Sequence, residues 1–175
     1  MPTKGSPATR SWLARHESYA LAKLGDRSGA ERALDQAQMV FARSMPDDEP
    51  PWMYFYDRAE LEYGVGSVYG ALGLAEPARQ ALQQAIATSD ISMVRDQAWN
   101  LARLGQTYVL DGEVDEACRR AGKALAIATD TRCDRVVTYV RELRTQLKPW
   151  GAEPMVRELD DQLAATKAWC RPATA

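Results

Sequence analysis

The sequence predicts an all-α fold built from antiparallel helix pairs stacked side by side. Three observations lead to it. Leucine occurs 16 times in the 175 residues, whereas the strand-favouring valine and isoleucine together occur 13 times. No segment sustains the alternation of apolar and polar residues that marks a strand. Finally, five residues recur at one fixed separation, which indicates an internal repeat.

The repeat becomes visible when residues 61–86 are aligned with residues 100–125. Five positions match at an offset of 39 residues: Gly66 with Gly105, Tyr69 with Tyr108, Gly73 with Gly112, Ala78 with Ala117, and Ala85 with Ala124. Each copy therefore predicts one helix, a glycine turn and a second helix. One matched glycine turn is a weak signal, but five matches at one offset are a strong one.

Each matched position has a physical role in such a helix pair. Gly66 and Gly105 allow the paired helices to approach closely, because glycine has no Cβ. Gly73 and Gly112 are expected to end the first helix in the left-handed conformation that glycine tolerates best. The two tyrosines fill the space between neighbouring pairs. The matched alanines lie where the second helix crosses the first.

The same frame extends in both directions along the chain. Upstream it reaches Gly25, with Ala30 and Ala37 at the alanine positions, although Ser18 replaces the first glycine and Leu21 the tyrosine. Downstream it reaches Gly151 in the turn of a degenerate fourth pair. Pro154 is expected near the start of the last helix, where proline is tolerated, and that helix, from Glu153 to about Trp169, is expected to cap the stack.

The spacing G-xx-Y-xxx-G-xxxx-A-xxxxxx-A resembles the tetratricopeptide repeat, a helix–turn–helix unit of about 34 residues. The longer period here predicts longer helices. The resemblance implies a tetratricopeptide-repeat α-solenoid forming a single domain over residues 11–170. We expect repeats at about 11–45, 52–90 and 93–130, a degenerate pair at 132–169, a flexible leader at 1–10 and a tail at 171–175.

One interval breaks the period. Gly25 and Gly73 are 48 residues apart, nine more than 39, and the extra residues coincide with the Pro- and Asp-rich stretch 45–51. This stretch is expected to be a loop, and it leads into the aromatic run WMYFY at 52–56. We expect the next helix to begin near Pro51 and to overhang the repeat by nearly two turns. Phe55 is expected in the core.

A groove is expected along the first helices of the pairs, which line the concave face of such a stack. Ten residues follow helical spacing along that face: Trp12, Tyr19, Trp52, Tyr56, Glu60, Tyr63, Arg95, Trp99, Arg103 and Gln106. Aromatic bodies with a few charges suit a ligand or peptide groove. The alternative is that these aromatics only fill a tight superhelix or pack against the terminal helix.

The sequence contains few candidate catalytic or metal-binding residues. His16 is the single histidine, so neither a histidine-based metal site nor a Ser/His/Asp set is expected. No glycine-rich phosphate loop is present. Glu60 and Asp57 offer an acid–base pair in an aromatic pocket, but carboxylates are equally expected in the first turn of a helix. We therefore expect no enzyme, no metal and no cofactor.

Charge and cysteine content restrict partners and location. The net charge is −2 and the pI is about 5.5, so direct nucleic-acid binding by this chain is not expected. Cys118, Cys133 and Cys170 are an odd number without metal-ligand spacing, which is typical of reduced thiols in the cytoplasm. No apolar run approaches the roughly 20 residues of a membrane span, and residues 1–10 lack the apolar core of a signal peptide.

A closer resemblance rests on three phrases: PPWMYFYDRAELE at 50–62, the run at 94–118, and VRELRTQLKPWGAEPMVRELDDQL at 140–163. They resemble the C-terminal tetratricopeptide sensor domains of actinobacterial XRE-type helix-turn-helix transcriptional regulators, over about Ser11 to Lys167. The resemblance implies a cytoplasmic dimer whose groove binds a peptide, protein or small-molecule effector and changes DNA affinity. Residues 1–10 cannot hold a helix-turn-helix, so we expect an excised sensor or a stand-alone relative.

The sequence is compatible with three functions. The leading one is a non-enzymatic binding module that senses the effector of a transcriptional regulator. The second is a stand-alone scaffold for protein–protein interaction. The third is a small-molecule-binding protein or enzyme of secondary metabolism that uses the aromatic groove. A closed pocket around Tyr56 and Trp99 favours a small molecule, whereas an open groove favours a peptide or protein.

Overall fold

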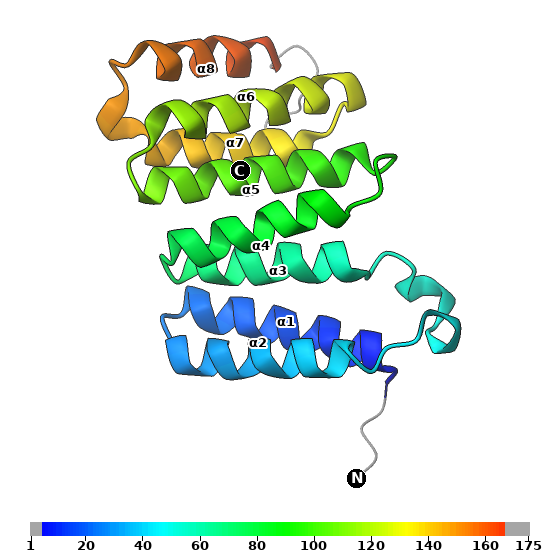
Figure 1. The fold of residues 1–175 in the computed structure, drawn as a ribbon. Helices are drawn as coiled ribbons and strands as arrows, with labels where there is room; N and C mark the ends of the chain where they lie inside the picture. The colour runs from blue at the N-terminus through cyan, green and yellow to red at the C-terminus, as the bar shows by residue number, and fades with distance from the viewer. Residues whose placement is uncertain (1–4, 167–175) are drawn as a thin grey trace, which may run out of the picture. The chain divides into compact units, whose positions relative to one another are not determined.

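The computed structural model describes residues 5–166, and this part of the chain contains only helices, turns and connections, without a strand. The all-α class is thereby confirmed. Eight α-helices follow one another in the described residues (Figure 1). They are α1 (Pro7–Lys23), α2 (Arg27–Phe41), α3 (Arg58–Ala71), α4 (Ala75–Thr88), α5 (Val94–Leu110), α6 (Val114–Thr131), α7 (Asp134–Gln146) and α8 (Pro154–Ala165).

The helices belong to two compact units that divide between Thr88 and Ser89. In the N-terminal unit, α1 packs on α2 and α3 packs on α4, while α1 and α3 also lie against each other. In the C-terminal unit, α5 packs on α6, α7 contacts both of them, and α8 lies mainly against α6. None of the eight helices is long and apolar enough to cross a membrane.

Three glycine turns join the helices of the first three pairs, and they have the same geometry. Gly25, Gly73 and Gly112 have φ of 80°, 74° and 74°, as the sequence predicts. In each turn the residue after the glycine donates its N–H to the carbonyl five residues earlier, closing a Schellman motif. The donor–acceptor distances are 3.0 Å for Asp26 to Leu21, 2.9 Å for Leu74 to Tyr69 and 3.0 Å for Glu113 to Tyr108.

The glycines inside the first helices sit at close crossings. A Cβ on Gly66 would lie 2.5 Å from Cγ of Leu82 on α4, and one on Gly105 would lie 2.8 Å from Cδ1 of Leu143 on α7. Both distances are below van der Waals contact, so only glycine fits without rearrangement. The crossing alanines are all fully buried: Ala78, Ala85, Ala117 and Ala124.

The fourth pair departs from this pattern. Gly151 has φ of −59° and ends the short 3₁₀ helix η3 (Lys148–Trp150), so it does not adopt the left-handed turn. The left-handed residue of this region is Arg132, with φ of 49°, between α6 and α7. Pro154 opens α8 as predicted, and α8 is tied to α7 by Arg144, which donates to both carboxylate oxygens of Asp160 at 2.6 and 2.8 Å. The expected end near Trp169 lies outside the described residues.

The helix after the aromatic run starts later than the sequence suggests. Pro51–Met53 form a single 3₁₀ turn, η2, after another at Pro46–Asp48, η1, and α3 begins only at Arg58. The cause is local, because the Asp57 carboxylate accepts the backbone N–H of Glu60 at 2.9 Å and caps the helix there. The aromatic run therefore belongs to an irregular connection, and the predicted overhang from Pro51 is wrong.

Candidate functional site

The ten residues predicted to line a groove fall in both units. The N-terminal unit contains six of them: Trp12, Tyr19, Trp52, Tyr56, Glu60 and Tyr63. The C-terminal unit contains the other four: Arg95, Trp99, Arg103 and Gln106. Each unit brings only some of its members into contact with residues that sequence reasoning did not select, and the two arrangements differ in chemistry.

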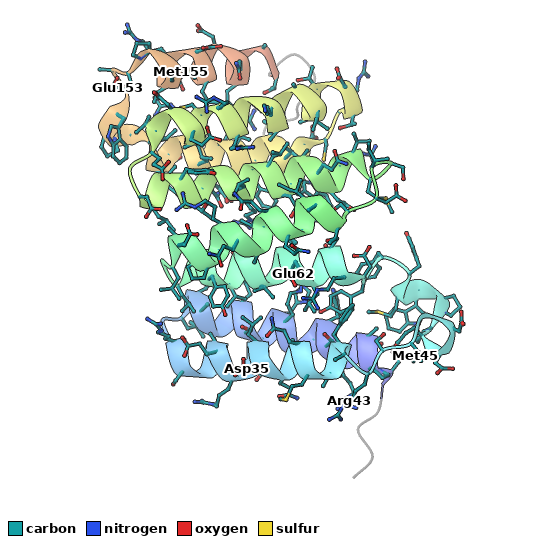
Figure 2. The ribbon with its side chains drawn as sticks, viewed as in Figure 1. Asp35, Arg43, Met45, Glu62, Glu153 and Met155 are labelled. Carbon is teal, nitrogen blue, oxygen red and sulfur yellow. The ribbon has the colours of Figure 1, made fainter. Side chains whose placement is uncertain are left out.

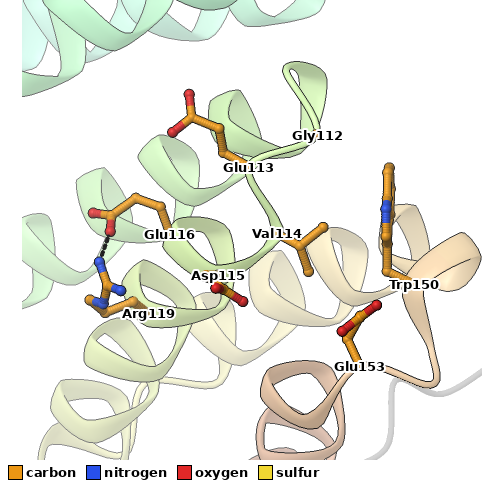
Figure 3. A pocket seen from close by; sticks show the side chains of 8 residues that line it. All are labelled: Gly112, Glu113, Val114, Asp115, Glu116, Arg119, Trp150 and Glu153. Carbon is orange, nitrogen blue, oxygen red and sulfur yellow. Dashed lines mark hydrogen bonds and ion pairs between the residues drawn. The ribbon is translucent and has the colours of Figure 1, made fainter.

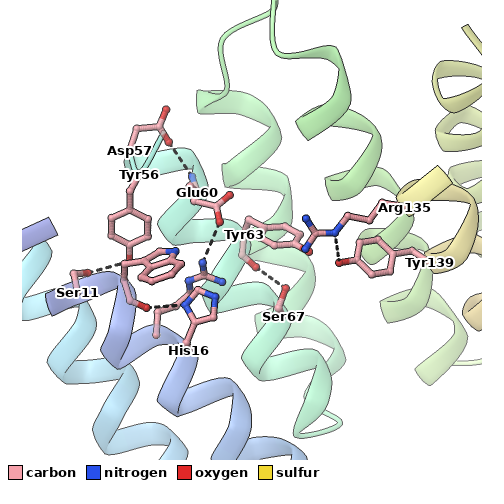
Figure 4. Close-up of polar contacts among 11 residues, drawn as sticks. Ser11, His16, Tyr56, Asp57, Glu60, Tyr63, Ser67, Arg135 and Tyr139 are labelled. Carbon is pink, nitrogen blue, oxygen red and sulfur yellow. Dashed lines mark hydrogen bonds and ion pairs between the residues drawn. The ribbon is translucent and has the colours of Figure 1, made fainter. Parts of the chain in front are cut away.

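Tyr56 is part of the core of the N-terminal unit. Its side chain is 5% exposed, its ring packs edge-on against Phe41, and its hydroxyl lies 3.0 Å from Oγ of Ser11 (Figure 4). Burial raises the pKa of the Tyr56 hydroxyl. Phe55 is 40% exposed instead, so the two rings are placed in the reverse of the predicted order. The hydrogen bond to Ser11, itself bonded to the carbonyl of Ala37 at 2.7 Å, draws Tyr56 inward.

A buried arginine connects α1 with α3. Arg15 is 7% exposed, and its Nη2 lies 3.0 Å from Oε1 of Glu60. Its side chain passes over Gly64, where a Cβ would overlap the arginine Cδ. Sequence reasoning missed this pair, although a glycine one turn after a carboxylate on a first helix was a usable signal. Glu60 and Asp57 thus have structural partners, as ion-pair acceptor and helix cap.

Four rings form a row on the surface of the N-terminal unit, here called the aromatic row: His16, Trp12, Phe55 and Tyr54. Successive ring centroids lie 4.4, 6.3 and 6.1 Å apart, all edge-to-face. Partial burial lowers the pKa of His16 and the charge of Arg15 adds to this, while the hydrogen bond to the Trp12 carbonyl opposes it. Trp12 and Tyr19 are half-buried against the core, whereas Tyr54 is 82% exposed.

The C-terminal unit stacks arginines on aromatic rings along α5 and α7. The guanidinium of Arg135 lies 4.7 Å from the ring centroid of Trp99, and that of Arg103 lies 4.4 Å from the ring centroid of Tyr139. Arg135 Nε also donates to the Tyr139 hydroxyl at 3.3 Å (Figure 4). We call Trp99, Arg135, Tyr139 and Arg103 the arginine–aromatic column. Such stacks are attractive because the ring face is electronegative.

Gln106 and Arg95 flank the column. Gln106 accepts from Arg103 Nη1 at 2.9 Å and donates to the Tyr139 carbonyl at 3.5 Å, which fixes the orientation of that arginine. Arg95 is exposed one turn before Trp99. The structure therefore places Trp99, Arg103 and Gln106 in one set of contacts with Arg135 and Tyr139, which sequence reasoning missed. The spacing of four residues places both of the latter on one face of α7, and that was the available signal.

A pocket of about 460 Å³ lies at the start of α6, and none of the predicted site residues lines it (Figure 3). Trp150 forms one wall, and the other lining residues include the carboxylates of Glu113, Asp115 and Glu153. The lining also contains Arg119, which forms an ion pair with Glu116, so the pocket carries its own cationic group (Figure 3). Carboxylates at this position are also explained by the helix macrodipole, which favours negative charge at a helix N-terminus.

Residues 5–166 contain no cluster of three His, Cys, Asp or Glu side chains that could hold a metal ion. Cys118 is buried on α6, and burial together with Asp115 raises the pKa of its thiol to about 11, so the reactive thiolate is scarce at neutral pH. Comparison with protein-family models, with curated proteins and with solved structures finds no match to this chain. Function is therefore inferred from its own residues and geometry.

Proposed function

We propose that this chain is a non-catalytic ligand-binding module, the effector-sensing part of a bacterial transcriptional regulator that works in the cytoplasm. In this proposal the helix pairs form a tetratricopeptide-type α-solenoid. Two observations support that fold. The first is the constant 39-residue offset, and the second is the set of three Schellman turns, whose hydrogen bonds are 2.9–3.0 Å long. The resemblance of the three phrases to regulator sensor domains supports the biological role.

The observation that carries the binding function is the arginine–aromatic column. A guanidinium stacked on a ring keeps its N–H donors in the plane of the group, where carboxylate and carbonyl oxygens are bound. Here the rings hold Arg103 and Arg135 in place, with Gln106 fixing the first of them. A held side chain loses less conformational entropy on binding than a mobile one. The surface thus suits a peptide, protein or small effector that presents anionic or acceptor groups.

Regulation requires more than binding. The effector must bind two conformations of the regulator with different affinity, since a ligand with equal affinity for both shifts nothing. A homodimer offers such conformations, because its interface can repack when the effector is bound.

Native mass spectrometry of the protein purified from its own host tests the proposal. The wild type is compared with Trp99→Ala/Arg135→Ala, and with Arg32→Ala on the exposed face of α2 as the matched control. We expect a bound ligand or partner on the wild type and the control, and its loss in the double variant with helical circular dichroism retained. Retention of the ligand by the double variant would exclude the column as the site. An apo mass, followed by a pull-down that captures nothing through the column, would overturn the function.

A further inference from the structure

We propose that the connection between α2 and α3 is a second binding surface, which takes arginine or lysine side chains from a basic segment of a partner protein. We call residues 45–57 the acidic aromatic connection. This surface lies within the N-terminal unit and is separate from the effector site proposed on α5 and α7. It lies in the interval that exceeds the repeat period by nine residues and includes the Pro- and Asp-rich stretch 45–51.

The connection exposes large aromatic side chains to solvent. Trp52 is 57% exposed, Tyr54 is 82% exposed and Phe55 is 40% exposed. Met45, at the start of the connection, is also exposed (Figure 2). A single exposed apolar residue is ordinary, but several within one short segment are typical of an interaction surface. Phe55 also continues the aromatic row towards Trp12 on α1.

The backbone that carries these rings is anchored to the core of the N-terminal unit. Met53 and Tyr56, on either side of the exposed pair Tyr54 and Phe55, are 3% and 5% exposed and anchor the segment in the core. Glu49 accepts the backbone N–H of Ala8 at 2.9 Å and the hydroxyl of Ser44 at 2.8 Å, which ties the connection to the start of α1. A partner therefore meets rings on a backbone that is already anchored, so ordering of that backbone does not oppose binding.

The charge of the connection selects a cationic partner. From Met45 to Asp57 the chain carries four carboxylates and no lysine or arginine. Glu49 is used inside the fold, whereas Asp47, Asp48 and Asp57 are exposed. Guanidinium and ammonium groups are bound by two attractions on such a surface. Carboxylates form ion pairs with them, and the negative electrostatic potential of an aromatic ring face forms cation–π contacts with them.

The C-terminal unit shows the same chemistry completed within the chain. There Trp99 and Tyr139 are covered by the protein's own arginines at 4.7 and 4.4 Å. In the described part of the chain, no arginine or lysine lies over the rings of Trp52 or Tyr54. The connection thus has the rings and the counter-charges, and a partner supplies the cation.

Isothermal titration calorimetry tests this inference by measuring the affinity of the protein for a short peptide that contains only leucine, serine and arginine. The matched peptide has citrulline in place of every arginine, which keeps the shape and removes the charge. We expect the arginine peptide to bind the wild type and the citrulline peptide not to bind. Trp52→Ala/Tyr54→Ala and Asp47→Asn/Asp48→Asn should each weaken binding by about tenfold or more, because each removes one of the two attractions.

The pocket beside Trp150 provides the matched control, since it also combines an indole with carboxylates. Trp150→Ala/Glu153→Gln should leave binding of the arginine peptide unchanged. Loss of binding in that variant, equal binding of the citrulline peptide, or no binding at all would overturn the inference. Asp47, Asp48, Trp52, Tyr54 and Glu153 are exposed and Trp150 is half-buried, so circular dichroism is recorded for every variant and should match the wild type. None of these variants touches the arginine–aromatic column, so binding of an effector there is an independent result.

Discussion

The two units place arginine and aromatic side chains on their first helices and use them in opposite ways. In the N-terminal unit Arg15 is buried, paired with Glu60 and laid over Gly64. In the C-terminal unit Arg135 and Arg103 lie on the rings of Trp99 and Tyr139. The comparison teaches that the same residue type is held by an ion pair in one unit and by aromatic rings in the other, and only the second arrangement is the one for which we propose a role in recognition. Amino-acid type alone does not separate the two uses.

The energies of the two arrangements differ as well. Removing one partner of a buried ion pair leaves an unpaired charge in the protein and costs on the order of 3–5 kcal/mol. A partly exposed cation–π contact contributes only about 0.5–1 kcal/mol. Variants of the ion pair should therefore change the free energy of unfolding. Variants of the cation–π contacts should leave that energy nearly unchanged and, under the proposed function, change ligand binding.

The largest effect is expected from Glu60→Gln. This change leaves Arg15 buried without its carboxylate, so we expect the free energy of unfolding to fall by about 3 kcal/mol, the lower end of the range for buried pairs because Glu60 is 24% exposed. Urea denaturation measures it, with Glu17→Gln on the exposed side of α1 as the control. A loss no larger than that of the control would mean that the pair is as weak as a surface salt bridge.

A smaller loss is expected from Gly66→Ala. Its Cβ would lie 2.5 Å from Leu82 Cγ and 3.0 Å from the Ala78 carbonyl oxygen, and overpacking of this kind costs about 2 kcal/mol. The matched control is Gly70→Ala on the same helix, whose Cβ meets nothing closer than 4.0 Å. That variant should gain about 0.5–1 kcal/mol from helix propensity. Thermal unfolding of the two variants measures this difference. If the melting temperatures of both variants shifted in the same direction, the close crossing at Gly66 would be contradicted.

The pH dependence of stability should expose the role of Glu49. Burial of its carboxyl opposes ionisation, but hydrogen bonds from Ser6, Ala8 and Ser44 outweigh this and lower its pKa. A lowered folded pKa stabilises the protein above the unfolded value of about 4.3, and this contribution is lost as pH falls through the folded pKa. Glu49→Gln should therefore lose stability at pH 7 and show a flatter decline between about pH 5 and 3. Equal slopes for wild type and variant would show that Glu49 does not contribute.

The smallest effect on folding is expected from Arg135→Ala. It removes cation–π contacts at the surface, so the free energy of unfolding should change by less than about 1 kcal/mol. Under the proposed function, binding of the effector should nevertheless weaken by about tenfold or more, as measured by titration with the ligand that native mass spectrometry identifies. Arg135→Lys is the informative companion, because it keeps the charge but loses the planar fork. A large loss of stability with intact binding would place Arg135 with Arg15 as a structural residue.

Local features were predictable from the sequence, and the long-range ones were not. The left-handed conformations of Gly25, Gly73 and Gly112 follow from the repeat alone, because a Schellman turn involves only neighbouring residues. The start of α3 was also encoded, since Asp57 followed by Glu60 three residues later is a capping signal, but the aromatic run before it suggested a longer helix.

The candidate sites depended on contacts that no local pattern contains. Whether Tyr56 or Phe55 turns inward is decided by Ser11, 45 residues earlier in the chain. The position of Arg135 over Trp99 depends on how α7 packs against α5, and that register follows from side-chain packing at the interface. The sequence could therefore indicate which residue types gather on the first helices, but not which of them remain accessible.

The hydrogen bond between Ala8 and Glu49 has a mechanical consequence. It joins two points 41 residues apart and ties the start of α1 to the connection, in addition to the packing of α1 on α2. A displacement of the start of α1 would therefore be transmitted through Glu49 to the segment that carries Trp52 and Tyr54.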